Sequence, residues 1–261
     1  MSRFLRWGFV LLFLAQGSAA LAQDKPRVIH LFVALCDNKS QGIVPVPPKI
    51  GNGDDPANNL YWGCSEGAKA VFSHAAEWQA VPGIKSPAPE ILERCVFKHA
   101  TLDAYLVADA YRGSEIKHAI SDFLESAAGK REEKLQVTVN RAPVELNLSG
   151  GASLVAYIGH NGLMEFAAPA TDATRGASAK PAIVLCCKSE TFFREPLARA
   201  GAKPVLTTTQ LMYPGAFILK AALDGWLKGE APAALRERAA KAYAENQKIS
   251  LSAARGVFTE W

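Results

Sequence analysis

The sequence lacks the features that mark several large classes of proteins. Its five cysteines and five histidines form no Cys-x-x-Cys or His-x-x-x-His spacing, so neither a metal site nor a cofactor is expected. The net charge is only +4 and the basic residues are scattered among acids, which excludes an obvious nucleic-acid surface. The chain also has no Ser/Gly-rich linker and no internal repeat. These absences favour one domain that acts on, or binds, something other than nucleic acid.

Long hydrophobic runs are missing everywhere except at the N-terminus. Residues 1–22 have the pattern of a secretory signal peptide, with early arginines, an apolar run over residues 7–15 and an Ala-Leu-Ala cleavage site. The apolar run is shorter than the roughly 20 residues that span a bilayer. We therefore expect a single domain over residues 23–261 that is periplasmic or secreted, without a stable membrane span.

The cysteines are few and odd in number, although thiols usually pair in an oxidising compartment. Cys64 and Cys95 are the expected disulfide pair, because both lie outside the predicted strand ends. Cys36 ends the first predicted strand, where it either pairs with Cys186 or is simply buried. At least one thiol should remain free, as an inert core residue or as a reactive group.

Short apolar runs alternate with amphipathic segments along the chain, the rhythm of βαβ units. We expect an α/β fold with a mostly parallel central sheet flanked by helices. The segment at 134–148 alternates only in part, so it is either a strand or an irregular edge. Strands are expected at 28–35, 102–110, 153–158, 182–185 and 203–208, and helices at 63–77, 114–127 (with Ser114 as N-cap), 195–200, 215–227 and 231–246.

Two neighbouring strand ends carry reactive residue types. His160 follows the run SLVAYI, and Cys187 follows the run AIVL after Cys186. In open parallel sheets, ligands gather at the carboxyl ends of the strands. A histidine there can take the proton of a thiol, and the thiolate is a nucleophile. Strand alternation sends the side chains of Cys186 and Cys187 to opposite faces, so only one of them can lie in the crevice.

The residues around these strand ends are candidates for contacts with a substrate. Gly162 allows close backbone approach near His160, and a free N–H group there could bind an oxyanion. Ser189 either caps the helix that follows Cys187 or lines a substrate pocket. The candidate oxyanion-binding or substrate-binding residues are Gly162, Asn161, Cys186 and Ser189.

The segments LVAYIGHNG and AIVLCC resemble the signature of the caspase-like cysteine peptidases, which include caspases, metacaspases, legumains and gingipains. The resemblance covers roughly residues 27–228. It matches His160 to the catalytic histidine, Cys186 to the small residue before the nucleophile, and Cys187 to the nucleophile itself, although Asn161 follows the histidine where the family has glycine. It implies a three-layer caspase-like sandwich and an exported peptidase that cleaves peptide or protein substrates.

Two other functions remain open from the sequence. A catalytically inactive caspase-like module would bind a peptide or protein partner in the same crevice. A thiol-redox or structural protein would instead carry Cys186 and Cys187 in an oxidised form.

Overall fold

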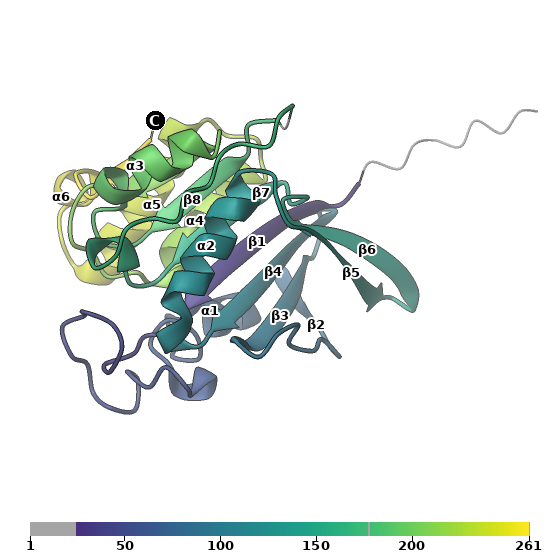
Figure 1. Cartoon of the computed structure of the whole chain (residues 1–261), viewed down its shortest axis with the longest axis horizontal. Helices are drawn as coiled ribbons and strands as arrows, with labels where there is room; N and C mark the ends of the chain where they lie inside the picture. Colours follow the sequence, from purple (N-terminus) through teal and green to yellow (C-terminus); the bar gives the residue numbers. More distant parts are fainter. Residues whose placement is uncertain (1–24, 177, 261) are drawn as a thin grey trace, which may run out of the picture.

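The computed structural model of the chain describes residues 25–176 and 178–260, so the predicted signal peptide lies outside the described residues. It shows a mixed α/β fold with a large, mostly parallel central sheet flanked by helices (Figure 1). This part of the fold prediction is confirmed. No helix within the described ranges is both long and apolar enough to cross a membrane.

The central sheet has eight strands in the order β10-β9-β8-β7-β1-β4-β3-β2. Its inner neighbours run parallel, and antiparallel pairs form both edges. The chain starts in the middle of the sheet with β1, and later strands add on either side. The strands are β1 (Arg27–Ala34), β2 (Trp78–Val81), β3 (Ile91–His99), β4 (Ala104–Tyr111), β7 (Leu154–Ile158), β8 (Pro181–Leu185), β9 (Lys203–Thr208) and β10 (Phe258–Thr259).

The inner strands are buried on both faces, as their continuous apolar runs predict. In β1, Ile29 and Leu31 pack on one face of the sheet, while Val28 and Phe32 pack on the other. Because successive side chains alternate between faces, this run supplies both halves of the core.

Helices cover the two faces and complete three layers. On one face the core is closed by α1 (Ala68–His74), α4 (Ala216–Trp226), α5 (Pro232–Gln247) and α6 (Leu251–Arg255). On the other it is closed by α2 (Ile116–Ala127), α3 (Ser189–Arg199) and the hairpin of β5 (Glu132–Val139) and β6 (Ala142–Ser149). In Figure 1 this hairpin projects from the end of the sheet where β1 begins.

Several local predictions need correction. The segment at 134–148 is the β5–β6 hairpin, whose turn at Asn140 and Arg141 has positive φ at both residues. Ser114 is not a helix N-cap: it lies in a 3₁₀ turn (η2, Gly113–Glu115) that precedes α2, and Glu115 occupies the cap position without a side-chain cap. The first helix is only α1, because residues 60–67 form turns instead.

Candidate functional site

A cavity of about 650 Å³ opens at the carboxyl ends of β1, β7 and β8. The next three strands in sequence, β2 to β4, lie on one side of β1 in the sheet, and β7 begins the other side. The loops after β1 and β7 therefore diverge. The cavity lies between these loops, the segment after β9 and α5. His160 and Cys187 both line it. The two residues predicted together at neighbouring strand ends therefore share one cavity.

Cys187 lies in the turn between β8 and α3, and its side chain faces the cavity. Its Sγ is 3.5 Å from both the backbone nitrogen and the carbonyl oxygen of Met212, which follows β9. Cys186 is fully buried in the core on the α2 and α3 side of the sheet. The two adjacent thiols are thus separated as strand alternation predicts, and only Cys187 reaches the cavity.

All five cysteines are free thiols in the described chain, so the expected Cys64–Cys95 disulfide is absent. The reason is that the two residues face different surroundings. The Cys64 thiol donates to the carbonyl of Asn58, while Cys95 on β3 lies beside Glu93. Burial raises the pKa of Cys64, and burial followed by the charge of Glu93 raises the pKa of Cys95 to about 12.

The two core thiols are also held in the protonated form. Burial raises the pKa of Cys36 to about 11, with the Tyr61 hydrogen bond acting in the opposite direction, and burial raises the pKa of Cys186 well above its usual value. Cys36 packs on the opposite face of the sheet from Cys186, which excludes a disulfide between them in this structure. Both behave as inert core residues.

The imidazole of His160 is paired with a carboxylate that the sequence analysis missed. Its Nε2 lies within hydrogen-bond distance of Glu165 Oε1, and that oxygen also accepts the N–H of Gly42 at 2.7 Å. Tyr157 donates its hydroxyl to the carbonyl of His160 at 2.7 Å, which fixes the backbone there. In the described residues no hydrogen bond joins the His160 ring to the Cys187 sulfur. Glu165 lies five positions after His160, so only the shared loop could have suggested it.

Asn161 and Gly162 are buried and are not among the residues that line the cavity. The Asn161 side chain is buried, donates to the carbonyl of Cys187 at 2.6 Å and accepts the N–H of Leu163 at 3.1 Å. A Cβ atom on Gly162 would lie 2.6 Å from the ring of Phe166, so the position is closely packed. The structure thus gives Asn161 a role in tying the two strand ends together, and leaves Gly162 without access to the cavity.

Ser189 is likewise away from the cavity. It is the first residue of α3 and fully buried, and its hydroxyl donates to the carbonyl of Val184 at 2.8 Å. The same hydroxyl lies 3.0 Å from Thr208 Oγ1 on β9. The N-cap position belongs to Lys188, whose backbone is left-handed with φ 50°. Ser189 therefore neither caps α3 nor lines the pocket, and instead joins β8 to β9.

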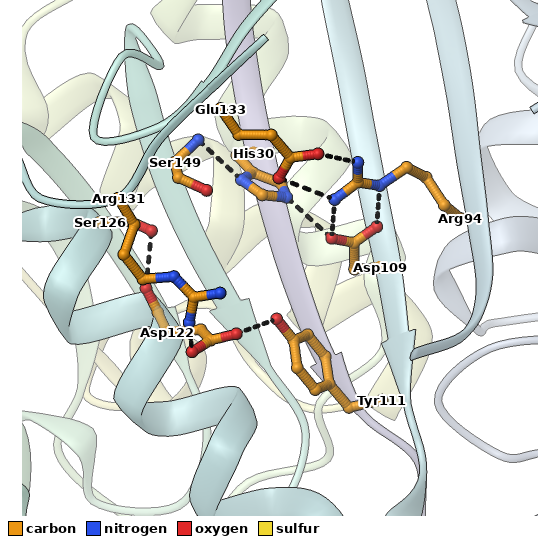
Figure 2. Close-up of polar contacts among 9 residues, drawn as sticks. All are labelled: His30, Arg94, Asp109, Tyr111, Asp122, Ser126, Arg131, Glu133 and Ser149. Atoms are coloured by element: carbon orange, nitrogen blue, oxygen red, sulfur yellow. Dashed lines mark hydrogen bonds and ion pairs between the residues drawn. The ribbon is translucent and has the colours of Figure 1, made fainter. Parts of the chain in front are cut away.

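A second polar cluster is buried under the β5–β6 hairpin, on the face of the sheet that α2 and α3 also cover (Figure 2). Arg94 donates twice to Asp109, at 2.6 and 2.7 Å, and also reaches Glu133 on β5 at 2.5 Å. His30 Nε2 is 3.0 Å from Asp109, and His30 Nδ1 accepts the backbone N–H of Ser149 at 3.0 Å. This pattern places the ring proton on Nε2. The cluster joins β1, β3 and β4 to the hairpin.

The electrostatics of this cluster are set by competing effects at Asp109. Its complete burial acts to raise the pKa, but hydrogen bonds from Arg94 and His30 outweigh burial and lower it. The carboxylate is therefore ionised and paired inside the core. A single polar residue inside each apolar strand run, as in VIHLF and VADAY, is the sequence pattern that could have revealed the cluster.

The described part of the chain contains no group of three or more His, Cys, Asp or Glu side chains placed to hold a metal ion. No protein-family model matches the sequence, and comparison with curated proteins and with solved structures gave no match. The function is therefore inferred from the cavity and its side chains.

Proposed function

We propose that this chain is an exported, caspase-like cysteine peptidase, or a related amide hydrolase, in which Cys187 is the nucleophile and His160 is the general base and acid. One observation carries the proposal: His160 and Cys187 follow adjacent parallel strands and line the same cavity. The three-layer arrangement of the sheet and helices agrees with the resemblance that the two sequence segments suggested. The location in the periplasm or outside the cell remains a prediction from residues 1–22.

The chemistry requires one proton carrier and one nucleophile. His160 accepts the proton of Cys187, and the thiolate attacks the amide carbonyl carbon of the substrate. The C–N bond then breaks as His160 returns the proton to the leaving amine, which leaves a thioester on Cys187. Water, deprotonated by His160, attacks this thioester, and the acid product leaves as the thiol is restored. The N–H of Cys187 is assigned to the oxyanion, because the N–H groups of Lys188 and Ser189 already donate to Gln210 and Thr208.

Glu165 is a positioning residue in this scheme. A base that takes a thiol proton needs its ring held in one orientation, and a carboxylate bonded to the second ring nitrogen does this in other nucleophilic sites. Glu165 is itself held by the N–H of Gly42, which belongs to the loop after β1. The loops after β1 and β7 thus cooperate in orienting His160.

The second candidate is a catalytically inactive caspase-like module that binds a peptide in the same cavity. The contacts of Cys187 with the backbone of Met212, and not with the His160 ring, favour this alternative. The two candidates differ in whether the thiol is activated. They share the cavity and the peptide ligand.

Labelling with a thiol-directed electrophile separates the candidates. For a hydrolase, the native protein should be modified fastest at Cys187, His160→Ala should slow this modification about 10²-fold or more, and Cys187→Ala should abolish it together with peptide cleavage. Cys64→Ala is the matched control, since it removes a partly exposed thiol outside the cavity and should leave the rate unchanged. Modification of Cys187 that is slow and indifferent to His160→Ala would reject catalysis and favour the binding module.

A further inference from the structure

We propose that the cavity selects a substrate whose side chain next to the scissile bond is large and apolar, such as Phe, Leu or Met. This inference rests on the proposed function, because it names the substrate class of the same site. It follows from the apolar side chains that line the cavity and from the absence of Asp, Glu, Lys and Arg among the described lining residues.

Apart from His160, which is bonded to Glu165, the described lining holds no side chain that could pair with a charged substrate group. None of the described residues that line the cavity is Asp, Glu, Lys or Arg. Beside Cys187 and His160 the lining is mainly aliphatic, as at Ile43, Val46 and Leu60. A buried charge without a partner is strongly unfavourable, whereas an apolar side chain is favoured in the same place.

The three tyrosines in the lining have polar neighbours of their own. The Tyr61 hydroxyl lies near the Cys36 thiol, and the Tyr213 hydroxyl lies near Glu66. The hydroxyl of Tyr243 on α5 accepts the N–H of Tyr213 at 3.2 Å. These residues therefore offer ring surface to a ligand more than hydrogen bonds, and aromatic or aliphatic groups pack well against such rings.

Exposed apolar side chains gather at the mouth of the cavity. In the described chain the large hydrophobic residues that are exposed are Val44 (87%), Leu211 (65%), Met164 (43%) and Ile249 (41%). The first three line this cavity, and they come from three separate loops. Apolar surface concentrated at one opening marks a site of interaction. At about 650 Å³ the cavity is of a size usual for ligand sites.

The test uses peptide electrophiles that differ only in the side chain next to the reactive group. Phe and Leu probes should label Cys187 on the order of 10²-fold faster than Asp, Asn and Lys probes, because only the apolar groups can be desolvated without loss. Labelling by an Asp, Asn or Lys probe at a rate equal to that of the Phe probe would overturn the inference.

Variants at the mouth sharpen the test. Leu211→Lys and Met164→Lys add a charge at exposed positions that the fold should tolerate, and each should reduce the advantage of the Phe probe over the Asp probe by about tenfold or more. Ile249→Lys is the matched control, an exposed apolar residue outside the cavity, and it should leave the ratio unchanged. Equal effects of all three variants would show that the cavity mouth does not select.

Binding to the Cys187→Ala protein separates this inference from the proposed function. Unreactive peptides of the same series are titrated into this variant, where selection is measured without chemistry. A preference for Phe over Asp without activated labelling of the native protein supports the selection and rejects the hydrolase. Labelling that depends on His160 but shows no preference supports the hydrolase and rejects the selection, and the absence of any preference in both assays also rejects it.

Discussion

The substitution Arg94→Met should be strongly destabilising, because Arg94 holds a carboxylate that no water reaches. The Arg94 and Asp109 side chains are 2% and 1% exposed, and two hydrogen bonds of 2.6 and 2.7 Å join them. Removal of one partner of a buried ion pair leaves the other charge unpaired, which typically costs about 3–5 kcal/mol. His30 remains bonded to Asp109 and limits the loss, so we expect a decrease near the lower end of that range.

The stability of the protein should also depend on pH through Asp109. The folded-state pKa of Asp109 lies below the unfolded-state value of about 3.9, so its contribution to stability is present above that pH and is lost as the pH falls through the folded pKa. In Arg94→Met the opposing cation is gone, burial dominates, and the pKa of Asp109 rises. Protonation of Asp109 then favours the folded variant, so the stability lost in Arg94→Met should be largest at neutral pH and should shrink as the pH falls through the raised pKa.

Urea unfolding followed by tryptophan fluorescence, repeated between pH 4 and pH 8, measures both effects. Arg238→Met is the matched control, because Arg238 also donates twice to a carboxylate, that of Glu230, but at the surface. Exposed pairs contribute little, so this variant should keep nearly the native unfolding midpoint. A loss of stability for Arg94→Met no larger than that of the control, or a loss that is as large at pH 4 as at pH 8, would contradict this prediction.

Three further changes test the cavity and its support. Glu165→Ala should slow labelling of Cys187 about tenfold or more in stopped-flow assays by releasing the ring of the base, whereas the surface control Glu115→Ala should not. Ser189→Ala should cost about 1–3 kcal/mol in urea unfolding, since it leaves buried partners unsatisfied, yet preserve labelling. Gly162→Ala should cost about 1–3 kcal/mol by overpacking, and a native-like melting curve would contradict the packing described.

The inner strands of the fold were predictable because each is a short, continuous apolar run. The predicted strand at 203–208 has the bounds of β9, and the other inner strands differ by one or two residues at an end. The antiparallel strands β2 and β3 were missed because polar and charged positions such as Lys98 interrupt their pattern. The packing of such strands depends on neighbours far away in sequence, which no local periodicity reveals.

The site was predictable only where position in the sheet decides it. His160 and Cys187 follow apolar strands directly, so the topology brings them to one edge and places both in the cavity wall. Glu165 and the loop near Gly42 were not predicted, because their approach to His160 depends on the path of two irregular loops. The role of Asn161 depends on a side-chain hydrogen bond between two strand ends, which spacing alone does not specify.

The separation of Cys186 and Cys187 has a practical consequence for following the motions of the protein. One peptide bond joins a thiol in the cavity wall to a thiol sealed in the opposite half of the core. Modification of Cys186 would require β8 or α3 to open, while Cys187 needs no such opening. The ratio of the two modification rates would then report how often β8 or α3 opens locally while the cavity beside them remains intact.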